Sequence, residues 1–240
     1  MRILILNCVE WECEHKRLNY PDDVGQWIID SFADQSIQFD VWRAQQETDI
    51  PAGSFDGVVI SGSTYSAYDE HEWIQRLSDK IKVWANNKTP LLGICFGHQI
   101  IARALGGVVK KNPQGWEIGV NPLELTEAGK NDPIFTGLNS PNKVMQTHQD
   151  IVVNLPPGAE CLASSAKCAI QALRIGDLIR TVQFHPEYTL DHINFILEPR
   201  RERLATDGVD IDATINDLEP LPEMRKISSN FVTHFVKKNI

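Results

Sequence analysis

The sequence predicts an α/β fold: a three-layer, mostly parallel sheet with helices on both faces. Two observations predict it. Short apolar runs typical of buried strands alternate along the chain with stretches in which apolar residues repeat at helical spacing. No internal repeat, low-complexity tract or linker rich in Pro, Gly or Ser interrupts this alternation. We therefore expect a single domain over residues 1–240.

The predicted strands are short and rich in branched or aromatic residues. They cover, in chain order, residues 1–6, 37–42, 57–60, 91–94 and 178–184. The predicted helices cover residues 23–33, 73–85, the stretch that begins at Phe96, 193–204 with an interruption at Pro199, and a closing helix at 231–236. The clearest helix is 73–85, whose apolar residues recur at helical spacing: Trp73, Leu77, Ile81 and Trp84.

The segment 91–107, LLGICFGHQIIARALGG, contains the most informative motif of the chain. It predicts a buried strand, a tight turn and a helix that ends at a double glycine. Cys95 lies at the apex of the turn, and Gly93 and Gly97 allow neighbouring backbone to approach it closely. The N–H groups of the first helical turn point toward the Cys95 sulfur and favour the thiolate. We therefore expect Cys95 to be a catalytic nucleophile.

A second motif supplies the base that such a nucleophile needs. The strand predicted at 178–184 ends in His185-Pro186-Glu187. The carboxyl ends of parallel strands form the sheet edge at which ligands bind, so His185 is expected beside Cys95. Pro186 ends the strand, and Glu187 can then orient the imidazole. Cys95, His185 and Glu187 form a nucleophile, base and orienting acid.

Residues 93–99 (GICFGHQ), together with His185-Pro186-Glu187, resemble the motifs of the class I (triad-type) glutamine amidotransferases, which include the glutaminase parts of GMP synthetase and anthranilate synthase. The resemblance covers about residues 1–190 and the final helix. It implies a flavodoxin-like amidotransferase fold and, with no cofactor, hydrolysis of the glutamine side-chain amide through a Cys95 thioester. The family passes the ammonia to a synthetase. This chain has no room for one, so a separate synthetase subunit is the expected partner.

The resemblance also implies an oxyanion hole of two backbone N–H groups. One comes from Phe96, and the other from Ser63 in the loop after the strand at 57–60. The commonest family pattern has two glycines and a proline where Gly62, Ser63 and Thr64 stand. Ser63 keeps the N–H group but would be strained at positive φ.

Further residues are expected to bind the substrate. The resemblance implies that Gln99, one helical turn after Cys95, contacts glutamine, and it places Gly62 beside the substrate. Residues 147–150 (THQD) resemble a His-x-Asp segment whose backbone receives the amino-acid end of the substrate. His148, Gln149 and Asp150 are therefore expected at that end.

The resemblance weakens over residues 190–225. Family members reach the closing helix soon after the His-Pro-Glu turn, whereas here roughly twenty-five extra residues intervene. The segment contains an acidic run and Pro220-Leu221-Pro222. One interpretation is a surface elaboration. The other is an insert that docks a partner or gates the substrate, because it begins directly after Glu187.

Composition limits the other classes of function. Five cysteines and no secretory leader predict a reducing, cytoplasmic location. A net charge of −9 disfavours binding to nucleic acid or anionic membranes, and the apolar run after Arg2 is too short to span a membrane. No metal is expected, because no second cluster completes a site with Cys8, Cys13 and His15.

The sequence leaves three functions open. The first is a stand-alone glutamine amidotransferase that feeds ammonia to a synthetase. The second uses Cys95, His185 and Glu187 to cleave a γ-glutamyl bond in a peptide or conjugate, since that bond is chemically close to the glutamine side-chain amide. The third is a regulatory relative without useful turnover.

Overall fold

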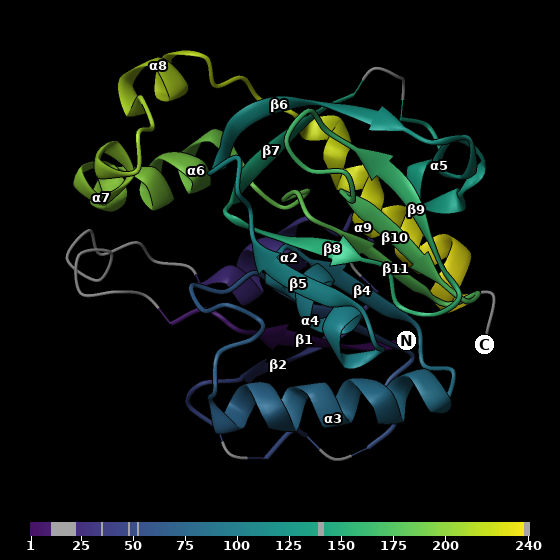
Figure 1. Cartoon of the computed structure of the whole chain (residues 1–240). Coiled ribbons are helices and arrows are strands. Elements are labelled where there is room, and N and C mark those ends of the chain that lie inside the picture. Colours follow the sequence, from purple (N-terminus) through teal and green to yellow (C-terminus); the bar gives the residue numbers. More distant parts are fainter. Residues whose placement is uncertain (11–22, 35, 48, 52, 139–141, 238–240) are drawn as a thin grey trace.

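The computed structural model of the chain describes residues 1–10, 23–34, 36–47, 49–51, 53–138 and 142–237 (Figure 1). A nine-stranded sheet runs through the described part of the molecule in the order β2-β1-β3-β4-β11-β10-β9-β6-β7. Its strands, in that order, are β2 (Gln38–Arg43), β1 (Arg2–Asn7), β3 (Gly57–Ile60), β4 (Leu91–Ile94), β11 (Ile179–Val182), β10 (Ala172–Ile175), β9 (Ala159–Ser164), β6 (Glu117–Leu125) and β7 (Asn142–His148). Two further strands, β5 (Val108–Lys111) and β8 (Asp150–Asn154), pair with each other.

The sheet changes direction at β11. From β2 to β11 neighbouring strands are parallel, whereas from β11 to β7 they are antiparallel. The predicted α/β class is confirmed, but the expectation of a mostly parallel sheet is wrong for this second half. Only residues 176–178 join β10 to β11, and so short a connection permits an antiparallel hairpin but no parallel crossover.

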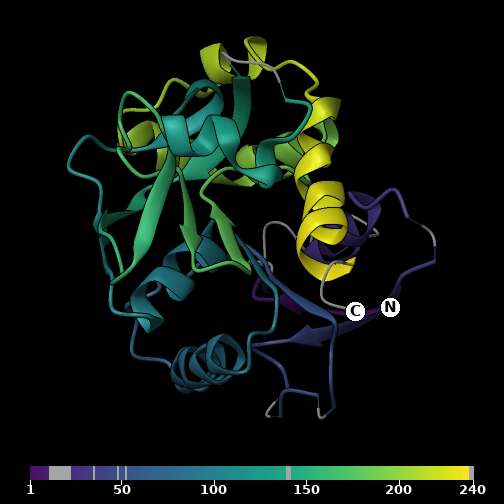
Figure 2. The same cartoon turned by 90° about the vertical axis from the view of Figure 1, so that its right-hand side faces the viewer.

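The parallel half has helices on both faces (Figures 1 and 2). One face is covered by α3 (Glu72–Asn86) and α4 (Phe96–Ala104). The other is covered by α2 (Val24–Asp30) and by α9 (Lys226–Phe231) with its π-helical continuation η4 (Val232–Val236). These helices agree with the predicted positions, except that the closing helix begins earlier than residue 231. In this half the predicted three layers are present.

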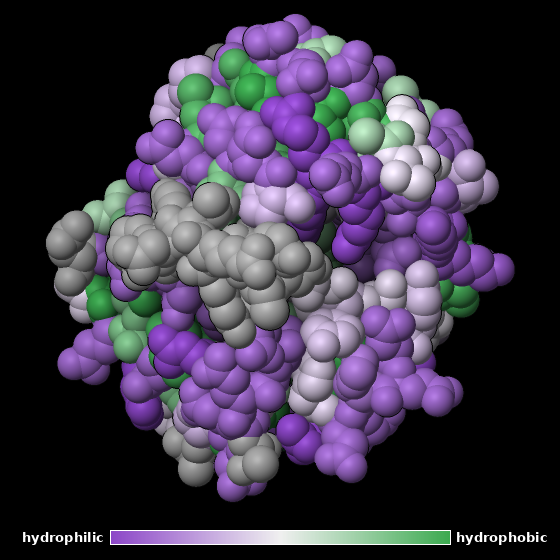
Figure 3. Space-filling view, turned by 90° about the vertical axis from the view of Figure 1, so that its left-hand side faces the viewer, coloured by the Kyte–Doolittle hydropathy of each residue, from purple (hydrophilic) through white to green (hydrophobic). Residues whose placement is uncertain are grey.

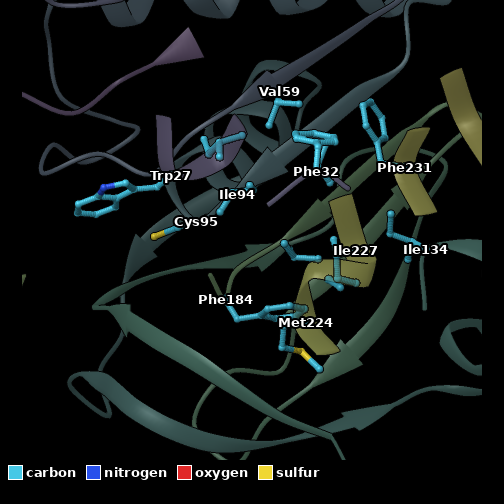
Figure 4. Close-up of a cluster of buried hydrophobic side chains, with 14 of the residues drawn as sticks. Trp27, Phe32, Val59, Ile94, Cys95, Ile134, Phe184, Met224, Ile227 and Phe231 are labelled. Atoms are coloured by element: carbon cyan, nitrogen blue, oxygen red, sulfur yellow. The ribbon is translucent and has the colours of Figure 1, made fainter. Parts of the chain in front are cut away.

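The antiparallel half curves around α9 (Figure 2). Leu123, Val144 and Leu162 of its strands share one buried cluster with Ile227 and Phe231 of α9. The same cluster continues to the centre of the parallel half (Figure 4). The short α5 (Glu127–Asn131) and η1 (Pro133–Phe135) complete this half. The two halves of the sheet are therefore built on a common core.

The 190–225 segment is helical and packs on the antiparallel half. It contains α6 (Leu190–Leu197), the 3₁₀ turn η2 (Glu198–Arg200), α7 (Arg201–Thr206), α8 (Ile211–Asn216) and η3 (Pro222–Arg225). The predicted interruption at Pro199 is confirmed, since Pro199 lies in η2. Its apolar residues pack with Met145 of β7 in a separate cluster: Ile193, Leu197, Leu204 and Ile211.

The described residues on the face of the molecule that Figure 3 shows are mostly hydrophilic. Figure 3 shows hydrophobic side chains there only in small separate groups. In the described ranges, no helix is both long and apolar enough to span a lipid bilayer.

Candidate active site

Cys95 occupies a sharp turn between β4 and α4. Its backbone has φ 52° and ψ −104°, a conformation that L-residues rarely adopt. The turn depends on its two glycines: a Cβ on Gly97 would lie 2.2 Å from the carbonyl oxygen of Ile60, and one on Gly93 would lie 2.5 Å from that of Gly97. The expected close approach of backbone is confirmed. Figure 4 shows Cys95 next to Ile94, at one end of the buried cluster.

The end of β11 lies directly beside this turn. The N–H of Cys95 donates to the carbonyl of Val182, at 2.9 Å, so the pairing of β4 with β11 continues to the cysteine. Three residues later, the N–H of His185 donates to the carbonyl of Met145, also at 2.9 Å. These two bonds bring Cys95 and His185 to the same edge of the sheet.

His185 and Glu187 form a buried pair. Nδ1 of His185 lies 2.8 Å from Oε1 of Glu187, and the two side chains are 2% and 0% exposed. Oε2 of Glu187 is buried and accepts no hydrogen bond from any described residue. Nε2 of His185 is buried as well and has no hydrogen-bond partner among the described residues, while the side chain of Cys95 acts on the imidazole from nearby. The imidazole thus lies between a carboxylate and a sulfur.

The charge on His185 follows from these neighbours. Burial lowers the pKa of its imidazole, but the charges of Glu187 and Cys95 outweigh the effect of burial and raise this pKa to about 10. The imidazolium is therefore the stable form at neutral pH.

Tyr188 supports the imidazole from one side. Its ring stacks on that of His185, with centroids 3.9 Å apart and an interplanar angle of 6°. Burial and the charge of Glu187 raise the pKa of Tyr188 well above its ordinary value, so the phenol stays neutral. Trp27 meets Tyr188 edge-on at 5.8 Å and stacks on His192 at 4.1 Å, which links this wall to the start of α6.

The residues expected to form the oxyanion hole lie beside the cysteine. Phe96 begins α4, so its N–H is one of the groups without an intrahelical partner. Ser63 lines the same pocket as Cys95, and a Cβ on Gly62 would lie 3.1 Å from Cε1 of His185. Ser63 does not have positive φ, since in the described part only Lys88 and Cys95 do so among non-glycine residues. The strain expected for this serine is therefore absent.

A pocket of about 140 Å³ opens over Cys95. Its lining brings together most of the expected substrate-binding residues with two arginines of the 190–225 segment: Ser63, Phe96, Gln99, His148, Gln149, Asp150, Arg200 and Arg203. A smaller cavity of about 30 Å³ adjoins it on the His185 side and is lined by Gly62, Cys95, His185, Tyr188 and Arg200 among others. Cys95 lies where the two meet.

Asp150 is fixed at the wall of the larger pocket. Its carboxylate accepts hydrogen bonds from Ser66 Oγ, at 2.5 Å, and from Tyr68 Oη, at 3.0 Å. Its backbone carbonyl accepts one from Nε2 of Gln99, at 2.8 Å. Gln99 is 3% exposed and also donates to Oε1 of Gln183, at 3.1 Å. Gln99 thus holds the 147–150 segment against the helix of the cysteine.

A buried polar network lies behind this wall. Nδ1 of His148 faces the carbonyl of Asp150 at 3.1 Å, and its Nε2 lies 2.7 Å from Oε1 of Gln146 and 3.3 Å from Oε2 of Glu117. Glu117 also accepts from Ser165 Oγ at 2.6 Å. Burial raises the pKa of Glu117, but its interactions with His148 and Ser165 outweigh burial, so this pKa lies below its ordinary value. Glu117 is therefore a buried carboxylate that anchors His148.

Other residues named from the sequence lie away from the pocket. His98 is fully buried, with Nδ1 2.7 Å from Oγ1 of Thr181, and burial lowers its pKa to about 3, so it packs as a neutral side chain. Cys8 is buried with its thiol 3.6 Å from the carbonyl of Leu6. Cys13 and His15 lie outside the described residues. Among the residues that the structure does describe, no group of His, Cys, Asp or Glu is arranged to hold a metal.

The structure adds residues that the sequence did not single out. Glu117, Tyr188, Arg200 and Arg203 all lie at or directly behind the pocket. The sequence could have indicated Tyr188, because this residue directly follows the His185-Pro186-Glu187 motif. For the other three, nothing in the local sequence indicates that the fold brings them to Cys95.

Comparisons with known proteins give matches in both sequence and fold. The model of the family "Glutamine amidotransferase class-I" matches residues 18–197. A Saccharomyces cerevisiae protein, assigned provisionally by its name to the glutamine amidotransferases, is 36% identical over 65% of this chain and 64% of its own length. Gamma-glutamyl peptidase 3 of Arabidopsis thaliana is 34% identical over 67% of each chain.

Two further matches extend the comparison. One subunit of the glutamine-hydrolyzing GMP synthase of Saccharolobus solfataricus is 40% identical over 55% of this chain and 68% of its own. Among solved structures, a glutamine amidotransferase of Thermotoga maritima superposes with a TM-score of 0.79 over 98% of both chains, at 22% identity. This last likeness concerns the fold alone.

Proposed function

The chain belongs to the class-I glutamine amidotransferase family, and on that premise we propose that it hydrolyses the side-chain amide of glutamine with Cys95 as nucleophile. The thiolate attacks the γ-carbonyl carbon, and the resulting oxyanion accepts hydrogen bonds from the N–H groups of Phe96 and Ser63. His185 gives its proton to the departing nitrogen, which leaves as ammonia. A thioester on Cys95 remains.

The second half of the reaction regenerates the enzyme. Neutral His185 takes a proton from water, and the hydroxide attacks the thioester carbon. The carbon–sulfur bond breaks, glutamate leaves, and the Cys95 thiolate and His185 imidazolium are restored. Throughout, Glu187 holds Nδ1 of the ring and stabilises its charge, at 2.8 Å.

One observation carries this proposal: a buried imidazole lies between Glu187 and a cysteine in a strained turn. Such a turn costs about 1–3 kcal/mol and persists only where the surrounding structure imposes it. Here the glycine contacts and the bond from Cys95 to Val182 impose it. The same geometry argues against the third function, that of a regulatory relative without useful turnover.

The smaller cavity has room for the leaving group that glutamine would give. The leaving group must lie on the side of the residue that protonates it, here His185. The cavity on that side holds about 30 Å³, which suits one or two molecules of the size of water or ammonia. We further propose that the ammonia passes to a synthetase on a separate chain. The match to one subunit of a GMP synthase supports this division of labour.

A γ-glutamyl peptide or conjugate hydrolase is the second candidate. It is supported by the match to gamma-glutamyl peptidase 3, which covers more of this chain than the match to the GMP synthase does. The chemistry at Cys95 would be the same, with an amine or a peptide leaving in place of ammonia. For either reaction Cys95 must be a free thiol, as it is in the structure.

Glutamate release by the purified chain tests the proposal. Glutamine and a panel of γ-glutamyl peptides are supplied to the wild type, to Cys95→Ala and to Cys161→Ala, a matched control at a cysteine outside the pocket. We expect release from glutamine that only Cys95→Ala abolishes. Faster release from the peptides would establish the second candidate, and no release from any substrate, with no thioester trapped on Cys95, would overturn both.

A further inference from the structure

We propose that the 190–225 segment supplies the carboxylate-binding part of the substrate site, through the guanidinium groups of Arg200 and Arg203. The ligand is the α-carboxylate that glutamine and γ-glutamyl compounds share. This inference rests on the proposed function, because it names the residues that hold the charged end of that substrate. It assigns the segment a role in recognition in place of a surface elaboration.

Both arginines reach the pocket because of how the segment folds. Thr189 caps α6 by accepting a hydrogen bond from the N–H of His192, at 3.3 Å, so α6 begins three residues after Glu187. Pro199 then breaks the helix in the turn η2. Arg200 ends this turn and Arg203 lies in α7, and the two line the same pocket as Cys95.

The rest of the segment fixes this position. Ile193, Leu197 and Leu204 are fully buried against Met145 of β7, on the strand that ends at His148. The arginines are therefore held by a packed helical unit and not by a surface loop. This packing fixes the backbone from which the two side chains extend; Arg200 is half-buried and Arg203 is exposed at the pocket.

Each arginine also interacts with another residue of the site. The guanidinium carbon of Arg203 lies 5.8 Å from the ring centroid of Trp116, another lining residue, and Nε1 of Trp116 donates to Asp207 at 2.8 Å. Arg200 lines both cavities, and its charge acts on Tyr188, the residue stacked on His185. Arg200 thus lies near the junction at which the reaction takes place.

The charges around the pocket match an α-amino acid. Arg200 and Arg203 are positive, whereas Asp150 is negative and is fixed by Ser66 and Tyr68. An α-amino acid carries one carboxylate and one ammonium group. Guanidinium groups bind carboxylates in a bidentate geometry, and a carboxylate such as Asp150 suits the ammonium. Arg200 and Arg203 are the cationic residues of the described lining and form its positive site.

Substrate and enzyme variants together test the proposal. Ammonia release is measured from glutamine and from glutamine whose α-carboxylate is capped as a methylamide, with wild type, Arg200→Gln, Arg203→Gln and the double variant. Arg201→Gln is the matched control, since Arg201 pairs with Glu198 and Asp212 on the exposed surface. Because hydrolysis at the capped α-position would release methylamine, ammonia reports the γ-position alone.

We expect kcat/KM for glutamine to fall about 10- to 100-fold in the double variant, mostly through KM, as is typical for loss of a charge-assisted hydrogen bond. For the capped substrate, kcat/KM should be low in the wild type and fall little further in the variants. Equal losses for both substrates would overturn the proposal. So would a loss seen only for γ-glutamyl peptides with a free C-terminal carboxylate, because the arginines would then bind the leaving group.

A second readout does not depend on turnover. Cys95 is alkylated with iodoacetate and with iodoacetamide, and its modification is followed by peptide mass spectrometry. The positive site should favour the anionic reagent, and this preference should fall several-fold in the double variant but not in Arg201→Gln. If the wild type shows that preference but no hydrolysis, the proposed function fails while the arginine site stands. An unchanged preference in the double variant would overturn the arginine site itself.

Discussion

The described part of the molecule contains two buried histidine–carboxylate pairs, which differ in what the second ring nitrogen faces. His185 and Glu187 lie at the end of β11, with Nδ1 and Oε1 2.8 Å apart. His148 and Glu117 join the ends of β7 and β6, with Nε2 and Oε2 3.3 Å apart. His185 leaves its second nitrogen facing Cys95, whereas both nitrogens of His148 lie against oxygen acceptors of the protein.

The difference separates a group that moves protons from a group that holds a position. A general acid needs one nitrogen directed at the reacting atoms, and only His185 has it. His148 uses both nitrogens within the protein and fixes the carbonyl of Asp150. A buried His–carboxylate pair is thus no evidence of catalysis in itself. The group that the second ring nitrogen faces determines whether the histidine can transfer a proton.

Of the substitutions that test this difference, Glu187→Gln should have the largest effect on activity. It keeps the size of the side chain but removes the charge that raises the pKa of His185 to about 10. Burial then lowers this pKa, so the imidazolium is lost at lower pH. We expect kcat for glutamine to fall about 100- to 10,000-fold, as when the acid of a hydrolase triad becomes an amide.

The pH profile distinguishes this cause from unfolding. The alkaline limb of kcat should move to lower pH in Glu187→Gln, since the proton that His185 gives to ammonia is lost earlier. Glu160→Gln, at an exposed carboxylate paired with Arg174, is the control and should leave the profile unchanged. An alkaline limb that stays in place in Glu187→Gln would contradict the role given to this carboxylate.

The two pairs also differ in how far the sequence could predict them. His185 and Glu187 are two residues apart after a clear strand, and Cys95 lies in a motif whose turn needs glycines at 93 and 97. Local sequence determines both. Glu117 and His148 meet only because β6 pairs with β7, and such a contact leaves no local pattern. The sequence predicted His148 near the substrate but not what holds it there.

The strands divide in the same way, into those that local sequence predicts and those that it does not. The parallel strands at 57–60 and 91–94 are fully buried runs, which are readily found in the sequence. The antiparallel strands were missed because their faces are mixed: β5 has one buried residue in four, and β10 has two buried followed by two half-buried ones. Neither shows a clean alternation. The arginines of the 190–225 segment were missed because only tertiary packing brings them to Cys95.

Glu117→Gln should have an intermediate effect, confined to binding. A glutamine amide is uncharged and has one acceptor oxygen, whereas Ser165 and His148 each use a different oxygen of Glu117, so His148 and the carbonyl of Asp150 lose their fixed position. We expect KM for glutamine to rise about 10-fold, equivalent to about 1.4 kcal/mol, with kcat within about three-fold of wild type.

The matched control for this variant is Glu124→Gln, at an exposed residue of the same strand, which should leave both constants unchanged. A fall in kcat of Glu117→Gln as large as that of Glu187→Gln would show that the second pair also takes part in proton transfer. The distinction between the two pairs would then be wrong.

Substitutions of Tyr188 should have the smallest effect and show how much of the His185 environment comes from stacking. The centroid of the ring lies 3.9 Å from that of the imidazole and the rings are parallel, an arrangement worth about 0.5–1.5 kcal/mol for an aromatic pair. Tyr188→Phe keeps that face and should retain kcat and the pH profile. Tyr188→Leu removes it, and we expect a fall in kcat of about two- to five-fold with a small shift of the alkaline limb to lower pH. If Phe lowered kcat as much as Leu, the hydroxyl and not the stacked ring would be the group that matters, and the charge on His185 would depend on Glu187 and Cys95 alone.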